Sequence, residues 1–186
     1  MFNRKLMGAL AALLLSLTTQ KAWAKTYFLP LYELSVTIPD SHRACWTPGM
    51  KDVFSVDALV DPRDKTNPCY QDAHVVRFFA DSISDDSDTL RTVRFKICRD
   101  VPGPCSPAPA HLIVPGHKTL AFKQSYADGT VEVYVTLTHD VARVGGHQRI
   151  FYIFSVLTTP RHFERDVAFF RKLLKDVRFG PAAPER

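Results

Sequence analysis

The chain has 186 residues, of which 46% are hydrophobic and 23% charged, and its formal net charge is +5. This length corresponds to one ordinary domain and is enough to bury a substantial hydrophobic core. The first 24 residues hold three basic and no acidic residues, so the other 162 carry 21 basic and 19 acidic residues, a net charge of +2. Nucleic-acid-binding domains usually carry clustered Lys and Arg, so the sequence predicts no nucleic-acid partner.

The first 24 residues have the organisation of a secretory leader. Arg4 and Lys5 precede a mainly apolar run over residues 6–17, and Ala22-Trp23-Ala24 places small residues two apart before Lys25. A basic head, about a dozen apolar residues and such a cleavage site are typical of a signal peptide, and the run is shorter than the roughly 20 residues that span a bilayer.

The leader sets the predicted domain organisation. We expect a signal peptide over 1–24 with cleavage near Ala24, a single domain over 25–180 and a flexible tail over 181–186. No Cys follows the apolar run closely enough to be lipidated. The sequence therefore predicts a periplasmic or secreted protein without a stable membrane anchor.

Strand-like segments dominate the predicted domain. Runs rich in β-branched and aromatic residues, bounded by Pro, Gly, Asp or Asn, predict strands. They cover residues 32–38, 53–60, 74–80, 90–97, 110–114, 120–123, 131–138 and 149–157. Asp128-Gly129 and Gly145-Gly146 are turn sequences that predict hairpins on either side of the 131–138 strand.

Near the C-terminus the hydrophobic period changes from two to about 3.6. The apolar residues recur at steps of four and three, as Phe163, Val167, Phe170, Leu174 and Val177. This spacing predicts an amphipathic helix that Thr159 caps and Gly180-Pro181 ends. Its apolar stripe must be buried, and the sheet offers the only large apolar surface. We therefore predict an α+β fold, an antiparallel β-sheet with the C-terminal helix packed on it, and a second helical segment between 41 and 53 or near 67–74.

All four cysteines lie after the leader, at Cys45, Cys69, Cys98 and Cys105. An even count in an exported chain favours two disulfides, for which three pairings are possible. We favour Cys98 with Cys105, because Pro102-Gly103 between them suits a tight turn, and this leaves Cys45 with Cys69. A metal site is the alternative, but no C-x-x-C spacing occurs.

The order of these elements resembles a known family. Val36-Thr37-Ile38-Pro39 ends an early strand, and residues 151–179 form a late aromatic strand followed by a Phe-rich helix. This outline is similar to the PsbP-like superfamily, an α/β/α arrangement around an antiparallel sheet that occurs in small exported bacterial proteins of the DcrB kind and in some immunity proteins of type VI secretion systems. The matching residues form the core, so the resemblance implies a fold and transfers no catalytic residues.

No residue pattern predicts a metal or cofactor. The seven histidines are scattered singly, without an H-x-x-x-H or H-E-x-x-H spacing. The acidic residues Asp81, Asp85, Asp86 and Asp88 are a weak candidate for Ca²⁺, since closely spaced carboxylates on a loop can supply its oxygen ligands. The segment lacks the frame of a calcium loop, so a solvated connection between strands is the favoured interpretation.

Two hairpin loops are the candidate binding regions. Tyr126 and Asp128 lie in the loop over 124–129, and His147 and Gln148 end the loop over 144–148. Their polar and aromatic side chains suit contact with a protein partner. The alternative is that both are ordinary solvated turns, because turn chemistry alone explains their composition.

These features together predict a non-enzymatic periplasmic binding protein, most specifically an immunity or inhibitor protein that occludes a toxic effector. The predicted partner is another protein. Two alternatives stay open. One is an accessory or structural component of the cell envelope. The other is a hydrolase whose residues, such as His139, His147 and the carboxylates of 85–88, converge only in three dimensions.

Overall fold

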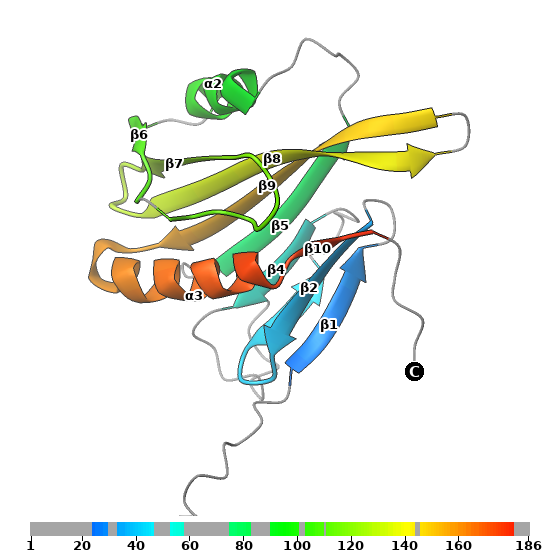
Figure 1. Ribbon diagram of the computed structural model, residues 1–186. Coiled ribbons are helices and arrows are strands. Elements are labelled where there is room, and N and C mark those ends of the chain that lie inside the picture. The colour runs from blue at the N-terminus through cyan, green and yellow to red at the C-terminus, as the bar shows by residue number, and fades with distance from the viewer. Residues whose placement is uncertain are drawn as a thin grey trace, which may run out of the picture.

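The computed structural model describes residues 24–29, 33–46, 53–57, 75–82, 90–100, 103–109, 111–143 and 146–180. This part of the chain forms two antiparallel sheets and two α-helices (Figure 1). The predicted α+β fold is thereby confirmed. The leader up to residue 23 and the tail over 181–186 lie outside the described residues.

The larger sheet has seven antiparallel strands. Their order across the sheet is β3 (Arg43–Trp46), β4 (Val53–Asp57), β5 (Val75–Ser82), β9 (Gly146–Thr158), β8 (Val131–Arg143), β7 (Thr119–Ser125) and β6 (Cys105–Pro107). Five of these strands match predicted strands, and β7, β8 and β9 pair as consecutive antiparallel neighbours, as expected. The helix predicted between 41 and 53 is wrong for residues 43–46, which pair with β4 instead; the alternative near 67–74 lies outside the described residues.

The smaller sheet has three strands, in the order β1 (Ala24–Leu29), β2 (Leu34–Pro39) and β10 (Arg178–Phe179). β2 alternates fully buried Leu34, Val36 and Ile38 with half-buried residues, which is the pattern of a strand with one face on the core. β10 is only two residues long, and it brings the chain after the C-terminal helix back to β2. The smaller sheet thereby joins the first and last described segments.

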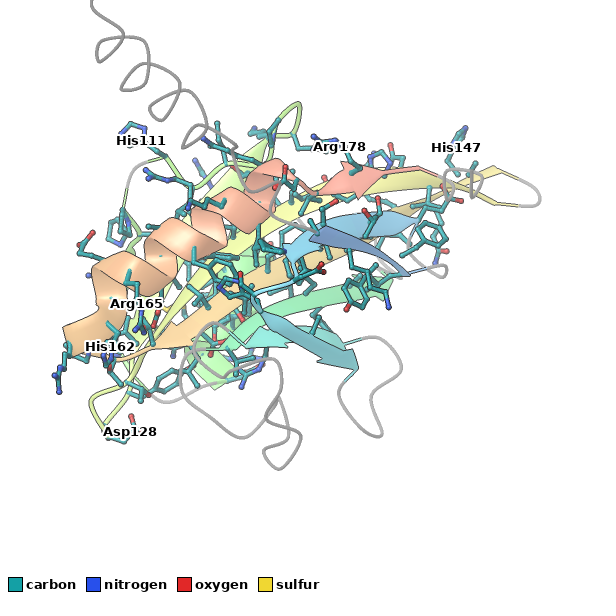
Figure 2. The ribbon with its side chains drawn as sticks, turned by 90° about the horizontal axis from the view of Figure 1, so that it is seen from below. His111, Asp128, His147, His162, Arg165 and Arg178 are labelled. Atoms are coloured by element: carbon teal, nitrogen blue, oxygen red, sulfur yellow. A yellow bond between two sulfur atoms is a disulfide. The ribbon has the colours of Figure 1, made fainter. Side chains whose placement is uncertain are left out.

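The C-terminal helix packs on one face of the larger sheet, as predicted (Figure 2). A single 3₁₀ turn, η2 (Pro160–His162), leads into α3 (Phe163–Lys175). Thr159 precedes this turn rather than α3, and its side chain makes no capping hydrogen bond. The buried stripe of α3 consists of Val167, Phe170, Leu173 and Leu174. Burying each such side chain stabilises the fold by about 1.5 to 3 kcal/mol, so this face holds α3 in place.

A buried carboxylate fixes the start of α3. Asp166 is fully buried, and it accepts hydrogen bonds from Thr158 Oγ1 at 2.6 Å and from Arg165 Nε at 2.8 Å. A buried charge is tolerated only when it is paired and hydrogen-bonded, and both conditions are met here. Because Thr158 ends β9, the contact sets the height of α3 on the sheet.

The strand predicted over 90–97 is wrong, because residues Leu90–Asp100 form the helix α2. Val93, Phe95 and Ile97 alternate as in a strand, but only Val93 is buried and Phe95 is 63% exposed. The segment over 111–114 is not a strand either, although Leu112 and Val114 are buried in the core. No helix in the described part of the chain is both long and apolar enough to cross a bilayer.

α2 lies on the face of the sheet opposite α3. Arg94 of α2 is stacked over the ring of Phe122 at 5.8 Å, and Phe122 stacks on Tyr134 of β8. Val133 and Val135, the neighbours of Tyr134 in β8, belong to the core cluster that includes the buried stripe of α3. Successive side chains of a strand point to opposite faces, so β8 contributes to both layers.

The predicted disulfide between Cys98 and Cys105 is confirmed, with a Cα–Cα distance of 5.9 Å. It fastens the C-terminal end of α2 to β6. Gly103 between them has a φ of +137°, and a Cβ at this position would lie 2.1 Å from the carbonyl oxygen of Ser125. Only glycine fits both the backbone angle and the close approach. The Cys45–Cys69 pairing stays a prediction, because Cys69 lies outside the described residues.

The close approach at Gly103 is testable. We expect Gly103→Ala to lower the free energy of unfolding by about 2 to 3 kcal/mol, because the new methyl group meets the backbone of β7 in a glycine-only conformation. Gly129→Ala is the matched control: Gly129 also has a positive φ, of +84°, but a Cβ there would have no neighbour within 4 Å. We expect a loss of about 1 kcal/mol there. Urea unfolding of the oxidised proteins measures both, and equal losses would contradict the steric argument.

Candidate functional site

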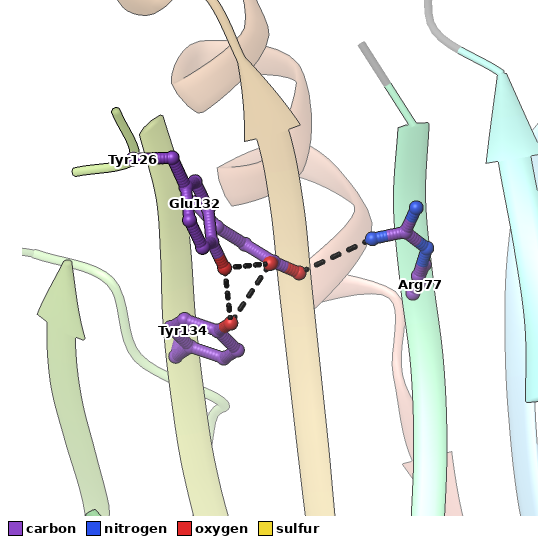
Figure 3. A network of polar contacts seen from close by, with 4 residues as sticks. All are labelled: Arg77, Tyr126, Glu132 and Tyr134. Carbon is purple, nitrogen blue, oxygen red and sulfur yellow. Dashed lines mark hydrogen bonds and ion pairs between the residues drawn. The ribbon is translucent and has the colours of Figure 1, made fainter. Parts of the chain in front are cut away.

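A network of polar side chains lies on the face of the larger sheet opposite α3 (Figure 3). Glu132 and Tyr134 project from the same face of β8, Tyr126 comes from the turn before it, and Arg77 comes from β5. The Glu132 carboxylate accepts hydrogen bonds at Oε2 from Tyr126 Oη at 2.7 Å and from Tyr134 Oη at 2.8 Å. Its Oε1 atom lies 3.3 Å from Arg77 Nη1. Every oxygen of this buried carboxylate is therefore paired.

Arg77 reaches Glu132 across an intervening strand. β5 and β8 both pair with β9, and Ser155 of β9 lies between them opposite both Arg77 and Tyr134. Adjacent strands lie about 4.8 Å apart, so the Arg77 and Glu132 side chains together bridge the roughly 10 Å between β5 and β8. Ser155 is small and buried, which leaves the space that the long side chain occupies. The network thus ties together β5, β8 and the β7–β8 turn.

The network holds its two phenols in the protonated form. Burial is the main cause that raises the pKa of Tyr126 to about 12. The hydrogen bond to Glu132 and the negative charge of Glu132 also raise this pKa, whereas the hydrogen bond to Tyr134 and the positive charge of Arg77 lower it. Burial also raises the pKa of Tyr134, with the Glu132 charge as the next cause. Protonated phenols can donate hydrogen bonds to Glu132, whereas phenolates would repel it. At neutral pH these groups act as donors inside the protein rather than as acids or bases.

The two predicted binding loops lie at opposite ends of β8. Asp128 is exposed at one end and His147 at the other, as Figure 2 shows. The 13 residues of β8 separate them by roughly 40 Å at about 3.3 Å per residue. The sequence-predicted binding residues therefore do not form one surface.

The β7–β8 turn uses its polar side chains internally. Tyr126 is half-buried in the Glu132 network, and Asp128 Oδ1 accepts hydrogen bonds from the backbone N–H of Thr130 at 2.9 Å and from its hydroxyl at 2.7 Å. The two hydrogen bonds from Thr130 lower the pKa of Asp128, and they close the turn before β8. The binding role of Tyr126 and Asp128 stays a prediction, but both side chains already have structural partners.

The opposite end of β8 forms an extended two-stranded arm. Among the described residues, β8 pairs with β7 as far as Leu137, and β9 pairs with β5 from Ile150 onward. Residues 138–143 and 146–149, here called the β8–β9 arm, continue to pair with each other beyond these limits (Figure 1). Arg149 Nε lies 2.9 Å from Asp140 Oδ1 across the two strands. His147 is exposed and Gln148 half-buried near the end of the arm.

Two histidines meet at the base of the arm. His117 Nε2 lies 3.4 Å from His139 Nδ1, and both rings pack on Phe179 of β10, with centroid distances of 4.4 and 4.7 Å. His117 Nδ1 lies 3.1 Å from the carbonyl oxygen of Pro115, which can only accept, so Nδ1 carries the proton. When both rings are neutral, His117 Nε2 is then the acceptor and His139 Nδ1 the donor. No metal-binding spacing of histidines marks this pair in the sequence, and it becomes apparent only when the β7–β8 register is extended.

The calcium candidate is not defined by the structure. Asp81 lies in β5, and Asp85, Asp86 and Asp88 lie outside the described residues. Among the residues that are described, no group of three or more His, Cys, Asp or Glu side chains is arranged to hold a metal ion. Calcium binding by the acidic segment therefore stays a weak prediction.

No protein-family model and no curated protein sequence matches the chain. Among solved structures, the chain is similar to the solution structure of cyanobacterial PsbP (CyanoP) from Synechocystis sp. PCC 6803. The TM-score is 0.47 and the sequence identity 11%, over 88% of this chain and 96% of that chain. This is a weak likeness of fold alone. The narrower resemblance to DcrB-like or immunity proteins stays a prediction.

The Glu132 network makes stability depend on pH in the alkaline range. The folded-state pKa of Tyr126 is raised above the ordinary value of 10.0 to about 12. The contribution of the protonated phenol to the free energy of unfolding is therefore complete below pH 10 and is lost as the pH rises towards 12. We expect the free energy of unfolding to fall over this window, and to fall less in Tyr126→Phe. Urea unfolding at about pH 9 to 12 measures the difference; an identical pH dependence in both proteins would contradict it.

The histidine pair predicts a second titration. Burial lowers the pKa of His139, and the neighbouring His117 lowers it further, while Asp140 and Glu33 oppose both effects. We expect His117→Gln to raise the pKa of His139, because the substitution removes the like charge that disfavours protonation. Titration of the imidazole NMR signals measures this shift, with His147→Gln as the control because His147 lies in the exposed end of the arm. An unchanged His139 titration in His117→Gln would contradict the pairing.

Proposed function

We propose that the protein is a non-enzymatic binding protein outside the cytoplasm, an immunity or inhibitor protein that occludes a toxic effector. The observation that carries this proposal is the β8–β9 arm, which extends past the neighbouring strands and presents His147 and Gln148 near its end. Binding surfaces are commonly built from polar loops held on a rigid scaffold. In the arm, paired strands form the scaffold and carry these polar residues.

The arm is ordered before any partner arrives. Its strands keep one register from the body of the sheet to Arg143 and Gly146, and the Asp140–Arg149 ion pair lies directly across them. On its inner face Val141 is fully buried. A preordered surface loses less conformational entropy on binding, which favours tight occlusion of a partner.

The expected compartment supports the same proposal. The first 24 residues have the pattern of an export signal, and the Cys98–Cys105 disulfide is of the kind that persists in oxidising compartments. A toxin delivered into the periplasm would meet its inhibitor there. The mechanism we propose is steric: the arm covers the effector's functional surface, and the folded body keeps the arm in place.

Survival under attack tests the proposed function. We expect a strain without this protein to be killed by neighbours that deliver the effector, and wild-type protein to restore its survival. The double substitution His147→Ala with Gln148→Ala should weaken protection at least about ten-fold, equivalent to about 1.4 kcal/mol of binding free energy. Arg171→Ala, on the exposed face of α3, is the control and should protect fully.

A strain without the protein that survives as well as its parent contradicts the proposal. If instead that strain becomes sensitive to detergent in pure culture, the alternative of an envelope accessory protein is favoured. Circular dichroism of the purified variants separates loss of binding from loss of folding.

A further inference from the structure

The outer surface of α2 combines an exposed aromatic ring with several cations. Phe95 is 63% exposed, and among the residues that the structure describes only Ile113 is another exposed large hydrophobic residue. Arg91 and Arg99 lie four residues before and after Phe95, so all three share one face of the helix. All three are exposed. We call Arg91, Phe95 and Arg99 the α2 stripe.

The α2 stripe is held rigidly although α2 buries little. Val93 is the buried residue of this helix, and Arg94 lies over the ring of Phe122 on the sheet. The Cys98–Cys105 disulfide fastens the last turn to β6. The covalent link holds a helix that packing alone supports only weakly, and it leaves the opposite side of that helix open.

Most of the charged residues of α2 are positive. Its eleven residues include four cations, Arg91, Arg94, Lys96 and Arg99, and one carboxylate, Asp100. Arg99 lies over the Phe95 ring at 5.9 Å and also contacts Asp100 at 2.7 Å. Arginine and aromatic side chains are the residues enriched at the centres of protein interfaces. The stripe is thus a small apolar surface bordered by positive charge.

We propose that the α2 stripe is a docking surface for an acidic segment of a partner protein. Carboxylates of the partner would pair with Arg91 and Arg99, and an apolar or aromatic side chain between them would cover Phe95. The surface is separate from the β8–β9 arm. The inference rests on the proposed function only in taking the occupant to be a protein.

An anionic membrane is a poorer occupant of this surface. Phe95 is the only large hydrophobic residue of α2 that is exposed. One exposed aromatic ring buries little area in a bilayer, whereas stable peripheral binding needs a broad apolar face. A protein segment can match a single ring and two guanidinium groups.

A defined acidic probe tests the docking surface without knowledge of the natural partner. The probe is a fluorescently labelled random copolymer of glutamate and tyrosine in a ratio of about four to one, and binding to the full mature chain is followed by anisotropy. We expect Arg91→Glu with Arg99→Glu to weaken binding at least about thirty-fold, since each reversal replaces attraction with repulsion. Phe95→Ser should weaken it about five-fold or more, with little change in salt dependence.

The outer face of α3 supplies the matched control. Arg171 and Lys175 are exposed on one face of α3, four residues apart. No large hydrophobic residue of α3 is exposed between them. Arg171→Glu with Lys175→Glu changes the net charge by the same amount as the α2 double variant. We expect it to weaken binding less than about three-fold, because the α2 stripe is intact.

Three outcomes would overturn the proposal. Equal losses in the α2 and α3 double variants would mean that the probe responds to net charge alone. Full binding by Phe95→Ser would remove the aromatic contact. Tighter binding to vesicles of phosphatidylcholine and phosphatidylglycerol in a ratio of about seven to three than to the probe, lost in the α2 variant, would assign the stripe to a membrane. Because none of these assays uses the effector, they can fail while the proposed function stands.

Discussion

The register of β8 between its two neighbours is the constraint on which the rest of this structure depends. Its odd-numbered residues, such as Val133 and Val135, face the core with α3, and its even-numbered residues carry the Glu132 network on the α2 side. A slip of one residue would bury Glu132 among apolar side chains and expose the valines. The network opposes that slip, because its hydrogen bonds form only in one register.

Much of this arrangement is predictable because local signals fix it. Asp128-Gly129 sets the β7–β8 hairpin, and the register that follows places residue 117 opposite residue 139, which is where the two histidines meet. The signal is therefore present in the sequence, but it appears only when the register is extended beyond Thr119. The Cys98–Cys105 pair is predictable for a similar reason, since the two cysteines lie seven positions apart.

The remainder depends on contacts that no local pattern carries. The alternation of Val93, Phe95 and Ile97 favours a strand, whereas the disulfide and the sheet beneath hold this segment as the helix α2. Arg77 reaches Glu132 from a strand 55 residues away and across β9. β10 is too short to show any periodicity, and it forms because α3 delivers it beside β2. Tertiary context decides each of these cases.

Polar residues that already have hydrogen-bonding partners within the protein are less suited to bind another protein than exposed residues on a fixed element. Tyr126 and Asp128 have hydrogen-bonding partners within the protein, so using them in an interface would first break those contacts or bury them further. His147 on the arm and Arg91 on α2 are exposed and lie on elements that are fixed elsewhere, by strand pairing in one case and by a disulfide in the other. Their side chains can meet a partner without a change in the fold. Exposure on a rigid element, rather than position in a loop, is therefore the physical criterion that favours the β8–β9 arm and the α2 stripe as binding surfaces.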